Sequence, residues 1–377
     1  MLLSHTFNDE TGGHGGDLAA AYARWDQTAG KLIDFSSNIN PLGPPAGLLE
    51  CLKKALPDIV AYPTPQAREL RYRLALFFNL PEQRLLLGNG ANELIHLLLI
   101  LLRPRRVFVP APSFSEYERA AKLAGAIVER FPLPPGEEPD YTSLIGQLTQ
   151  GDLLVFCNPS NPTGKLFKRA DLLPLVKAAE EQGAKVLLDE SFIPLTGSAE
   201  ESLRDLELDH LWVVISLTKI WGLPGLRLGC LVGPGTEVVE ISRWGDPWRV
   251  NFLAQQAGLY CLAQENYIAE TLTLIAEERA YLENHIKATG AFEVFEAAAN
   301  FLLIRGLDPQ FKVERFQADL AQLGLLVRRA DNFPGLDQRY FRIAVRKRAE
   351  NERLVKAIKS WLEVGDAETD RFTGSDQ

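Results

Sequence analysis

Residues 216–233 read SLTKIWGLPGLRLGCLVG, and this stretch decides how the chain folds. The apolar run Leu211–Leu217 predicts a buried strand that ends in Ser-Leu-Thr-Lys. A turn rich in glycine and proline follows, and an arginine stands just before a second apolar run. Because a buried strand rarely ends on a lysine without a use for it, we expect the polar side chains here to gather around a ligand. They are Ser216, Thr218, Lys219 and Arg227.

Short apolar runs alternate with helical patterns on both sides of this stretch, from about residue 46 to residue 235. The runs are continuous and rich in β-branched residues, which suits strands of a sheet that is covered on both faces. This βαβ rhythm predicts an α/β fold with a mostly parallel central sheet, whose ligands bind at the carboxyl ends of the strands. The predicted strands are residues 84–88, 106–110, 126–130, 152–158, 185–191, 211–217 and 227–233.

A smaller α+β domain is predicted after this sheet. A long helical pattern over 251–286 precedes a strand pair, 300–306 and 339–345, and a last helix over 351–364 has one apolar face. The polar sequence after that helix is typical of a disordered tail. We therefore expect an N-terminal arm (1–45), a large ligand-binding domain (46–265), a small C-terminal domain (266–364) and a disordered tail (365–377).

Composition excludes several classes of protein. The net charge of −9 argues against a nucleic-acid binder, and the longest apolar run is too short to cross a bilayer. The first residues lack the basic start and apolar segment of a signal peptide. The cysteines are far apart, which predicts reduced thiols of a cytoplasmic protein and neither a disulfide frame nor a metal site. They are Cys51, Cys157, Cys230 and Cys261.

Polar residues also follow three other predicted strands. After the strand at 84–88 comes GNGANE, whose glycines and helix start suit an anion, although a plain glycine turn with Asn92 as helix cap gives the same pattern. After 152–158 comes NPSNPTGK, in which two Asn-Pro steps fix the direction of the Asn161 amide. Asp189 follows a buried run and needs a partner there. Taken singly, Asn161 and Asp189 are also typical structural caps, and Lys219 a typical surface lysine.

Taken together, these residues fit one ligand, pyridoxal phosphate. Asp189 suits a protonated ring nitrogen, Asn161 the ring hydroxyl and Lys219 the aldehyde, to which a lysine bonds covalently. Phe114 in APSFSEY would stack on the ring, unless it belongs to the core. The phosphate would be held by Gly90, Ala91, Asn92, Ser216, Thr218 and Arg227. Lys219 and Asp189 would then be the catalytic residues.

The chain resembles the fold-type-I, class I/II aminotransferase superfamily across nearly all of residues 14–362, with NPSNPTGK, LLDESF and SLTKIWGLPGLRLG as the matching motifs. The resemblance implies a large domain with an open mixed sheet and a small C-terminal domain. It also implies the cofactor roles given above for Asn161, Asp189 and Lys219, with Ser216 and Arg227 on the phosphate. Such enzymes are usually homodimers with shared sites, and Tyr62 in AYPTP matches a tyrosine that reaches the neighbour's cofactor phosphate.

Two branches of that superfamily are close: histidinol-phosphate aminotransferases and the threonine-phosphate decarboxylases of cobalamin biosynthesis. The second resemblance is the stronger, and it lies in HGGDLAAAYARW, DFSSNINPLGPP, SFSEYERA and NFPGLDQRYFRIAVR. Phe192 supports it, because aminotransferases of the first branch usually have tyrosine there. The GNGANE loop departs from relatives in its side chains at Ala91 and Asn92. In the decarboxylase branch the residues that hold the substrate correspond to His14, Gly15, Asn38, Asn161, Arg328 and Arg342.

The implied substrate is O-phospho-L-threonine, with Arg342 on the α-carboxylate and Arg328, with His14 and Asn38, on the phosphate. For Arg328 the alternative is a solvated turn in RRAD. The implied product is (R)-1-amino-2-propanol O-2-phosphate for the nucleotide loop of cobalamin. O-phospho-L-serine, which would give ethanolamine phosphate, differs by one methyl group, and a pocket discriminates against that by only roughly 10- to 200-fold.

Two further alternatives remain open from sequence alone: a histidinol-phosphate aminotransferase, and a regulatory protein that keeps the fold without turnover. The choice between loss of carbon dioxide and transamination depends on how the two anionic ends of the substrate are fixed, and no single residue displays it. It rests here on the resemblance. The only partners expected are the small phosphorylated substrate and a second copy of the chain.

Overall fold

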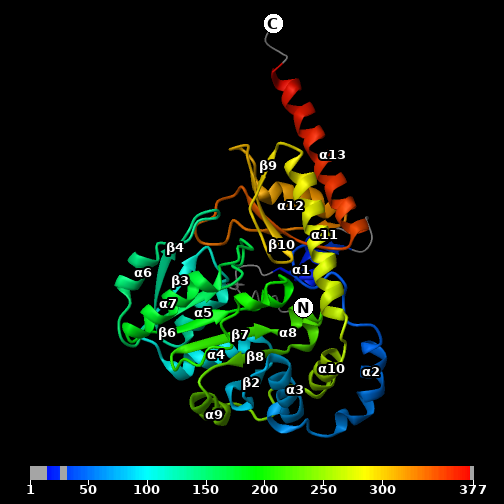
Figure 1. Cartoon of the computed structure of the whole chain (residues 1–377). Helices are drawn as coiled ribbons and strands as arrows, with labels where there is room; N and C mark the ends of the chain where they lie inside the picture. Colours follow the sequence, from blue (N-terminus) through cyan, green and yellow to red (C-terminus); the bar gives the residue numbers. More distant parts are fainter. Residues whose placement is uncertain (1–14, 26–31, 374–377) are drawn as a thin grey trace, which may run out of the picture. The chain divides into compact units, whose positions relative to one another are not determined.

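The computed structural model describes residues 15–25 and 32–373 (Figure 1). The chain divides into two compact units. The larger comprises Ile39–Glu277 and Glu296–Asn300, and the smaller comprises Met1–Asn38, Glu278–Phe295 and Phe301–Gln377 as far as these ranges are described. The four-part division expected from the sequence, with a separate arm and tail, stays a prediction.

The larger unit is built on one seven-stranded sheet in the order β2-β8-β7-β6-β5-β3-β4. All its neighbouring strands are parallel except where β8 pairs with β2 and β7. This confirms the mostly parallel sheet, and each strand coincides with one of the predicted apolar runs. The strands are β2 (Leu85–Gly88), β3 (Arg106–Ala111), β4 (Ile127–Pro132), β5 (Leu153–Cys157), β6 (Lys185–Asp189), β7 (Leu211–Ser216) and β8 (Gly229–Val232).

Helices cover the sheet of the larger unit and bury its apolar side chains (Figure 1). One cluster joins the inner faces of α4 and α5 to the middle strands, with Leu98, Val109, Val155 and Trp212 all essentially inaccessible. Burying each such side chain contributes about 1.5–3 kcal/mol. The helices are α2 (Leu48–Ala55), α3 (Arg68–Phe78), α4 (Ala91–Leu102), α5 (Ser115–Leu123), α6 (Tyr141–Gln147), α7 (Arg169–Glu181), α8 (Leu217–Ile220), α9 (Gly235–Trp244) and α10 (Phe252–Leu262).

Short 3₁₀ helices connect several of these elements, and one longer helix, α11 (Tyr267–Lys287), supplies residues to both units. The 3₁₀ helices are η1 (Leu56–Val60), η2 (Pro65–Ala67), η3 (Glu82–Arg84), η4 (Ile193–Leu195), η5 (Ala199–Glu201) and η6 (Pro224–Leu226).

The smaller unit has a four-stranded antiparallel sheet, in the order β12-β13-β10-β9, and a parallel pair, β1-β11. Aromatic rings form much of its core: Phe316 lies 4.8 Å from Phe341 and 5.1 Å from Trp361 between ring centroids. Its strands are β1 (Ile33–Asp34), β9 (Phe292–Val294), β10 (Phe301–Gly306), β11 (Leu325–Leu326), β12 (Arg328–Arg329) and β13 (Tyr340–Ala344). Its helices are α1 (Leu18–Arg24), α12 (Val313–Gln322) and α13 (Arg348–Thr373).

The C-terminal helix is longer than the sequence pattern indicated. We expected it to end at Val364 and a disordered tail to follow, but the backbone of α13 stays helical as far as Thr373. The added sequence, GDAETDRFT, contains no proline, and its single glycine costs only about 1 kcal/mol in a helix. Polar composition alone therefore marked the helix end too early. Over the described residues, no helix combines the length and apolar character needed to cross a membrane.

Candidate active site

The carboxyl ends of the parallel strands in the larger unit bring the predicted cofactor residues to one edge of the sheet. Across β7, β8 and β2, Ser216 pairs with Gly229 and Gly229 pairs with Gly88. On the other side of β7, Asp189 closes β6 opposite Cys157, the last residue of β5. The opening stretch (residues 216–233), the glycine loop (GNGANE, residues 88–93) and the end of β6 at Asp189 therefore lie at the same edge, as expected for a sheet of this topology.

The glycine loop and Arg227 form one side of this edge. Gly90 has φ +87°, and a Cβ atom on it would lie 2.4 Å from Nη2 of Arg227, so the guanidinium lies against the loop. A Cβ atom on Gly229 would lie 2.5 Å from the backbone nitrogen of Ala91. Helix α4 begins at Ala91 without a side-chain cap, so its dipole and first N–H groups are directed at the same place. The result is a cradle for an anion.

Asn92 stands in the first turn of α4, and its amide does not face this cradle. Its Nδ2 donates to Oε2 of Glu116 at 3.2 Å. Any contact of Asn92 with a phosphate therefore comes from its backbone, as the departure of this loop from relatives suggested.

The hydroxyls of the opening stretch lie next to the cradle. Ser216 and Thr218 are buried, with 2.8 Å between their oxygens, and the backbone nitrogen of Ser216 donates to Oγ of Ser191 at 3.0 Å. Lys219 lies in the single helical turn α8, and its carbonyl accepts a hydrogen bond from the backbone nitrogen of Asn40 at 3.2 Å. The turn thus has a fixed backbone that presents two hydroxyls and an amine.

Asp189 is a buried carboxylate held by two hydrogen bonds. The Tyr117 hydroxyl donates to Oδ2 at 2.7 Å, and the backbone nitrogen of Ser191 donates to Oδ1 at 2.9 Å. Burial raises the pKa of Asp189, while these hydrogen bonds and the positive charge of Lys219 act in the opposite direction. A cation placed opposite Asp189 would stabilise its ionised form.

Sequence reasoning missed Tyr117. It lies one helical turn after Phe114, its ring is 5.6 Å from the Phe114 ring, and it is 1% exposed. Nothing in the pattern of α5 distinguishes it from a core residue. A chemical signal was available, because a tyrosine on the buried face of a helix needs a partner for its hydroxyl. Asp189 was the candidate, since its carboxylate was predicted to be buried and in need of a partner.

The loop after β5 is fixed by Asn158, which is fully buried. Its Nδ2 donates to the carbonyl of Phe167 at 3.0 Å, and its Oδ1 accepts from the backbone nitrogen of Phe167 at 2.8 Å. Its own backbone nitrogen donates to the carbonyl of Asp189 at 2.9 Å. This clamp fixes the loop that also carries the half-buried Asn161, whose role toward the ring hydroxyl stays a prediction. Phe192 is buried close in sequence to Asp189 and offers no hydroxyl.

Two arginines of the smaller unit lie side by side. Arg328 pairs with Arg342 across β12 and β13. Burial lowers the pKa of Arg342 to about 9, assisted by the charge of Arg328, and burial lowers the pKa of Arg328 to about 10. Two guanidinium groups of like charge on neighbouring strands destabilise each other unless anions neutralise them. The pair is therefore suited to a ligand with more than one negative charge, and Arg328 does not belong to a solvated turn.

Other predicted substrate residues lie in the same unit. Nη2 of Arg342 donates to the carbonyl of Ser36 at 3.0 Å, and a Cβ atom on Gly15 would lie 2.1 Å from that same oxygen. Asn38 is 3% exposed, and its Oδ1 has no hydrogen-bond partner among the described residues. Gly15, Asn38 and the arginine pair thus belong to one unit, while His14 lies outside the described residues.

Tyr62 is not brought to the other predicted cofactor residues. Its side chain is 82% exposed, and its ring lies 4.8 Å from that of Trp248. No group of histidine, cysteine, aspartate and glutamate residues in the described chain is arranged to hold a metal ion. The cysteines are free thiols, and burial raises the pKa of Cys230 to about 12, so it stays protonated.

The chain is similar to known proteins in sequence and in fold. Residues 30–358 match the family described as aminotransferase class I and II. The chain is 34% identical over 355 residues to the threonine-phosphate decarboxylase of Salmonella typhimurium strain LT2, covering 93% of this chain and 96% of that one.

Two solved structures are similar to this chain. The histidinol-phosphate aminotransferase from Clostridium acetobutylicum has a TM-score of 0.81 at 31% identity, covering 87% of this chain and 98% of that one. The L-threonine-O-3-phosphate decarboxylase from Porphyromonas gingivalis has a TM-score of 0.77 at 26% identity, covering 87% and 99%.

Proposed function

Because the chain belongs to the aminotransferase class I and II family, we propose that it is a pyridoxal-phosphate-dependent decarboxylase of O-phospho-L-threonine. The product would be (R)-1-amino-2-propanol O-2-phosphate for the nucleotide loop of cobalamin. The 34% identity to a threonine-phosphate decarboxylase over nearly the whole of both chains supports this assignment. The observation that carries the substrate class is the arginine pair on neighbouring strands, the partly buried Arg328 and the buried Arg342.

The residues at the sheet edge fit pyridoxal phosphate. The buried carboxylate of Asp189, with its raised pKa, gains a partner in a protonated ring nitrogen, and Lys219 supplies the amine for the aldehyde. The cradle of Gly90, Ala91, the Asn92 backbone and Arg227, with the hydroxyls of Ser216 and Thr218, would hold the phosphate. Phe114 would cover the ring and Asn161 would bind its hydroxyl. When bound, the cofactor supplies an electron sink for the bond that breaks.

The arginine pair accounts for the charge of the substrate. Arg342 would bind the α-carboxylate, and Arg328, with Gly15, Asn38 and His14, the phosphate. Each guanidinium has a planar fork that matches such oxyanions. Burial lowers both pKa values, and an anion bound to the pair would oppose this shift by stabilising the charged guanidinium groups. Fixing both anionic ends also fixes which bond of the α-carbon faces the cofactor.

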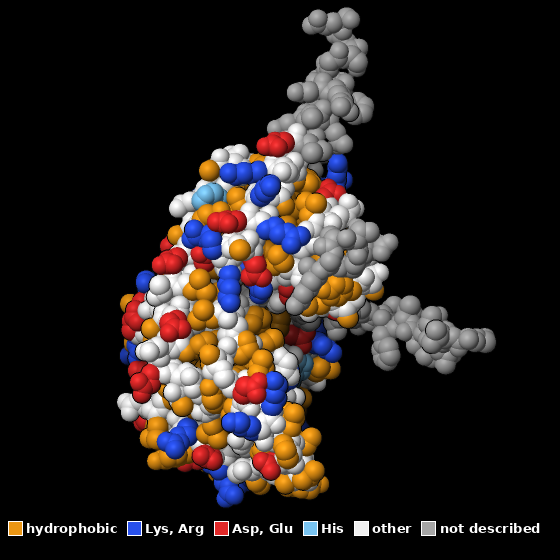
Figure 2. All heavy atoms as spheres, turned by 90° about the vertical axis from the view of Figure 1, so that its right-hand side faces the viewer, with side chains coloured by type: hydrophobic (Ala, Val, Ile, Leu, Met, Phe, Trp, Pro, Cys, Tyr) orange, Lys and Arg blue, Asp and Glu red, His pale blue; other side chains and the backbone are white. Residues whose placement is uncertain are grey.

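We also propose that the enzyme is a cytoplasmic homodimer. Apolar side chains are exposed after α2, with Val60 91% exposed and Ile59 57% exposed, beside the 82% exposed Tyr62. Figure 2, which faces the side on which α2 lies in Figure 1, shows hydrophobic side chains exposed among charged ones. A second copy that covers these residues would remove them from water and would place Tyr62 at its neighbour's cofactor phosphate.

Transamination of histidinol phosphate is the second candidate, because the 31% identity and the TM-score of 0.81 to such an enzyme support it. O-phospho-L-serine remains an alternative substrate that differs by one methyl group. A non-catalytic regulatory role is the remote alternative, and retention of Lys219, Asp189, Asn161 and Arg227 speaks against it.

The deciding experiment incubates cofactor-loaded protein with O-phospho-L-threonine and no amino acceptor, and follows the product by mass spectrometry. We expect a product lighter by carbon dioxide that keeps its amine, and no product from a Lys219→Ala variant. Unchanged substrate, or a keto acid formed only when 2-oxoglutarate is added, would reject the decarboxylase assignment. Histidinol phosphate with 2-oxoglutarate would then be the next pair to test.

A further inference from the structure

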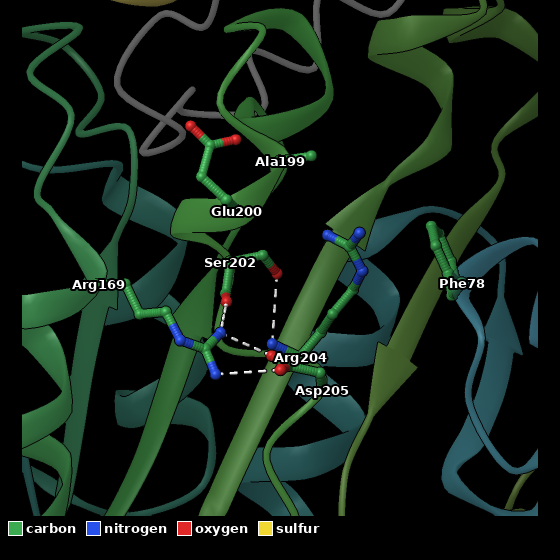
Figure 3. A pocket seen from close by; sticks show the side chains of 7 residues that line it. All are labelled: Phe78, Arg169, Ala199, Glu200, Ser202, Arg204 and Asp205. Atoms are coloured by element: carbon green, nitrogen blue, oxygen red, sulfur yellow. Dashed lines mark hydrogen bonds and ion pairs between the residues drawn. The ribbon is translucent and has the colours of Figure 1, made fainter.

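A pocket of about 360 Å³ lies in the larger unit, outside the residues assigned to cofactor and substrate (Figure 3). Its walls come from the end of α3, the start of α7, the short helix η5 and the segment that follows η5. The volume is that of a site for a small molecule. Its lining residues are Phe78, Arg169, Ala199, Glu200, Ser202, Arg204 and Asp205.

The guanidinium of Arg204 has no direct partner in this pocket, and its charge acts on Glu190 and Asp205 only at longer range. The guanidinium of Arg204 lies over the ring of Phe78, 5.1 Å from its centroid, and within the described chain it makes no hydrogen bond or ion pair. Arg169, in contrast, pairs through both nitrogens with Asp205, at 2.7 and 3.0 Å. Figure 3 shows the Arg204 side chain directed away from that pair. Arg204 is therefore the group that remains available to an anion.

The segment that carries Arg204 has a fixed backbone. The backbone nitrogen of Arg204 donates to Oγ of Ser202 at 3.2 Å, and Ser202 in turn hydrogen-bonds the buried Glu190. The backbone nitrogen of Leu203 also donates to Glu190, at 2.8 Å. Because the backbone is held at Leu203 and Arg204, only the Arg204 side chain needs ordering when a ligand binds beside the Phe78 ring.

The start of helix α7 is not the binding feature. Its first backbone nitrogen, that of Arg169, already donates to Oε2 of Glu201 at 2.6 Å. A ligand would instead be held by the fork of Arg204 and the face of Phe78. The formal charges of Arg169, Arg204, Glu200 and Asp205 sum to zero, so beyond the single charge that Arg204 can pair with, the lining has no excess positive charge for a dianion.

We propose that this pocket is a second ligand site, which binds a small organic acid. Its carboxylate would pair with Arg204 and its apolar body would cover the Phe78 ring. An aromatic or branched monocarboxylate meets both requirements, whereas inorganic phosphate has the wrong charge and no apolar part. The proposal is independent of the reaction at Lys219, because none of the pocket residues contributes to that site.

The test uses 4-bromobenzoate, whose bromine locates it directly. Crystals of the cofactor-loaded protein are soaked with it, and an anomalous difference map is calculated. We expect a bromine peak beside Phe78 and Arg204. A map with bromine at the arginine pair, Arg328 and Arg342, but none beside Phe78 overturns the proposal.

Calorimetry with the same compound tests the site in solution. Arg204→Ala should lower the pocket affinity at least tenfold, and Arg204→Lys, which keeps the charge but loses the planar fork, should lower it by less. Arg73→Ala is the matched control, because Arg73 is an exposed arginine of α3 outside the lining. An unfolding midpoint equal to that of the wild type shows that each variant folds. Unchanged affinity in Arg204→Ala, or inorganic phosphate binding as tightly as 4-bromobenzoate through Arg204, contradicts the proposal.

Discussion

Tyr117 holds the carboxylate that is expected to face the cofactor ring. Burial raises the pKa of Tyr117, so its hydroxyl stays a donor to Asp189 throughout the working pH range. Tyr117→Phe removes this hydrogen bond, and hydrogen bonds to charged groups contribute about 1.5–3 kcal/mol. We expect the affinity for pyridoxal phosphate, measured by fluorescence titration of the apoprotein, to fall about tenfold or more.

Tyr141→Phe is the matched control for this prediction. Tyr141 is a tyrosine of the same unit whose buried hydroxyl has no hydrogen-bond partner within the described chain. It should bind pyridoxal phosphate as the wild type does. Equal affinities of the two variants would show that the bond between Tyr117 and Asp189 does not serve the cofactor.

Glu190 makes the stability of the fold depend on pH. Burial raises its pKa to about 7 from an ordinary value of 4.5, so the folded state binds a proton that the unfolded state releases between these two pH values. The free energy of unfolding is therefore highest below the lower value, and it falls as the pH rises toward 7, by at most about 1.4 kcal/mol per pH unit. Glu190→Gln imitates the protonated form and should remove this decrease.

Urea unfolding at pH 5 and pH 8 measures the effect. Glu240→Gln, on the exposed face of α9, serves as the control and should keep the wild-type slope. If Glu190→Gln loses as much stability as the wild type between the two pH values, Glu190 is not the group responsible.

At the scale of elements, the turn between β2 and α4 links the backbone conformation of Gly90 to the position of Arg227 in the anion cradle. A Cβ atom on Gly90 would meet Nη2 of Arg227 at 2.4 Å, and φ is +87°. Because φ is +87° and ψ is 162°, a combination that is essentially restricted to glycine, Gly90→Ala should lose about 1–3 kcal/mol of stability and should also displace Arg227. We expect its affinity for pyridoxal phosphate to fall about tenfold or more.

Gly125→Ala separates the effect of backbone strain from the effect of displacing Arg227. Gly125 has φ +79°, but a Cβ atom there would meet nothing within 4 Å. It should lose stability through its positive φ alone, by no more than Gly90→Ala, while its affinity for the cofactor should match the wild type. A similar loss of affinity in both variants would mean that backbone strain, and not Arg227, is the cause.

The strands were predictable because buried parallel strands are continuous apolar runs, as at Leu153–Cys157 and Leu211–Ser216. The polar residues after them could be located for the same reason, since carboxyl ends share one edge of the sheet. Tyr117 was missed, because the need of its hydroxyl for a partner does not say which partner, and the side of α5 that meets β6 is set by packing. The pocket around Arg204 depends on contacts between α3, α7 and residues 202–205, which no local pattern displays. The last helix was predicted to end at residue 364, which is too early, because the polar composition of the following residues was given more weight than their helix propensity.

At the scale of the whole molecule, the proposed sharing of sites between two subunits predicts how mixed dimers behave. Lys219→Ala and Tyr62→Ala should each be nearly inactive as pure proteins. In a mixed dimer, one site combines an intact Lys219 with an intact Tyr62 from the other subunit, while the second site carries both defects. Equilibrated mixtures should therefore recover about a quarter of the wild-type activity.

Native mass spectrometry would establish that the subunits have exchanged. Mixed dimers whose activity is no more than the sum of the two pure variants would contradict the role proposed for Tyr62. A chain that stays monomeric at the concentrations of the assay would contradict the dimer itself.

The order β2-β8-β7 has a consequence for how the chain folds as it is made. In the sheet, β2 pairs with β8 alone, and the ribosome adds residues 229–232 long after residues 85–88. Until then the apolar residues Leu85, Leu86 and Leu87 have no neighbouring strand, and the growing chain is at its most prone to aggregate. Insertion of β8 also brings Arg227 to the Gly90 loop. We therefore expect the chain to bind its cofactor only late in synthesis, after β8 has joined the sheet. A bound cofactor would then mark chains whose sheet is complete.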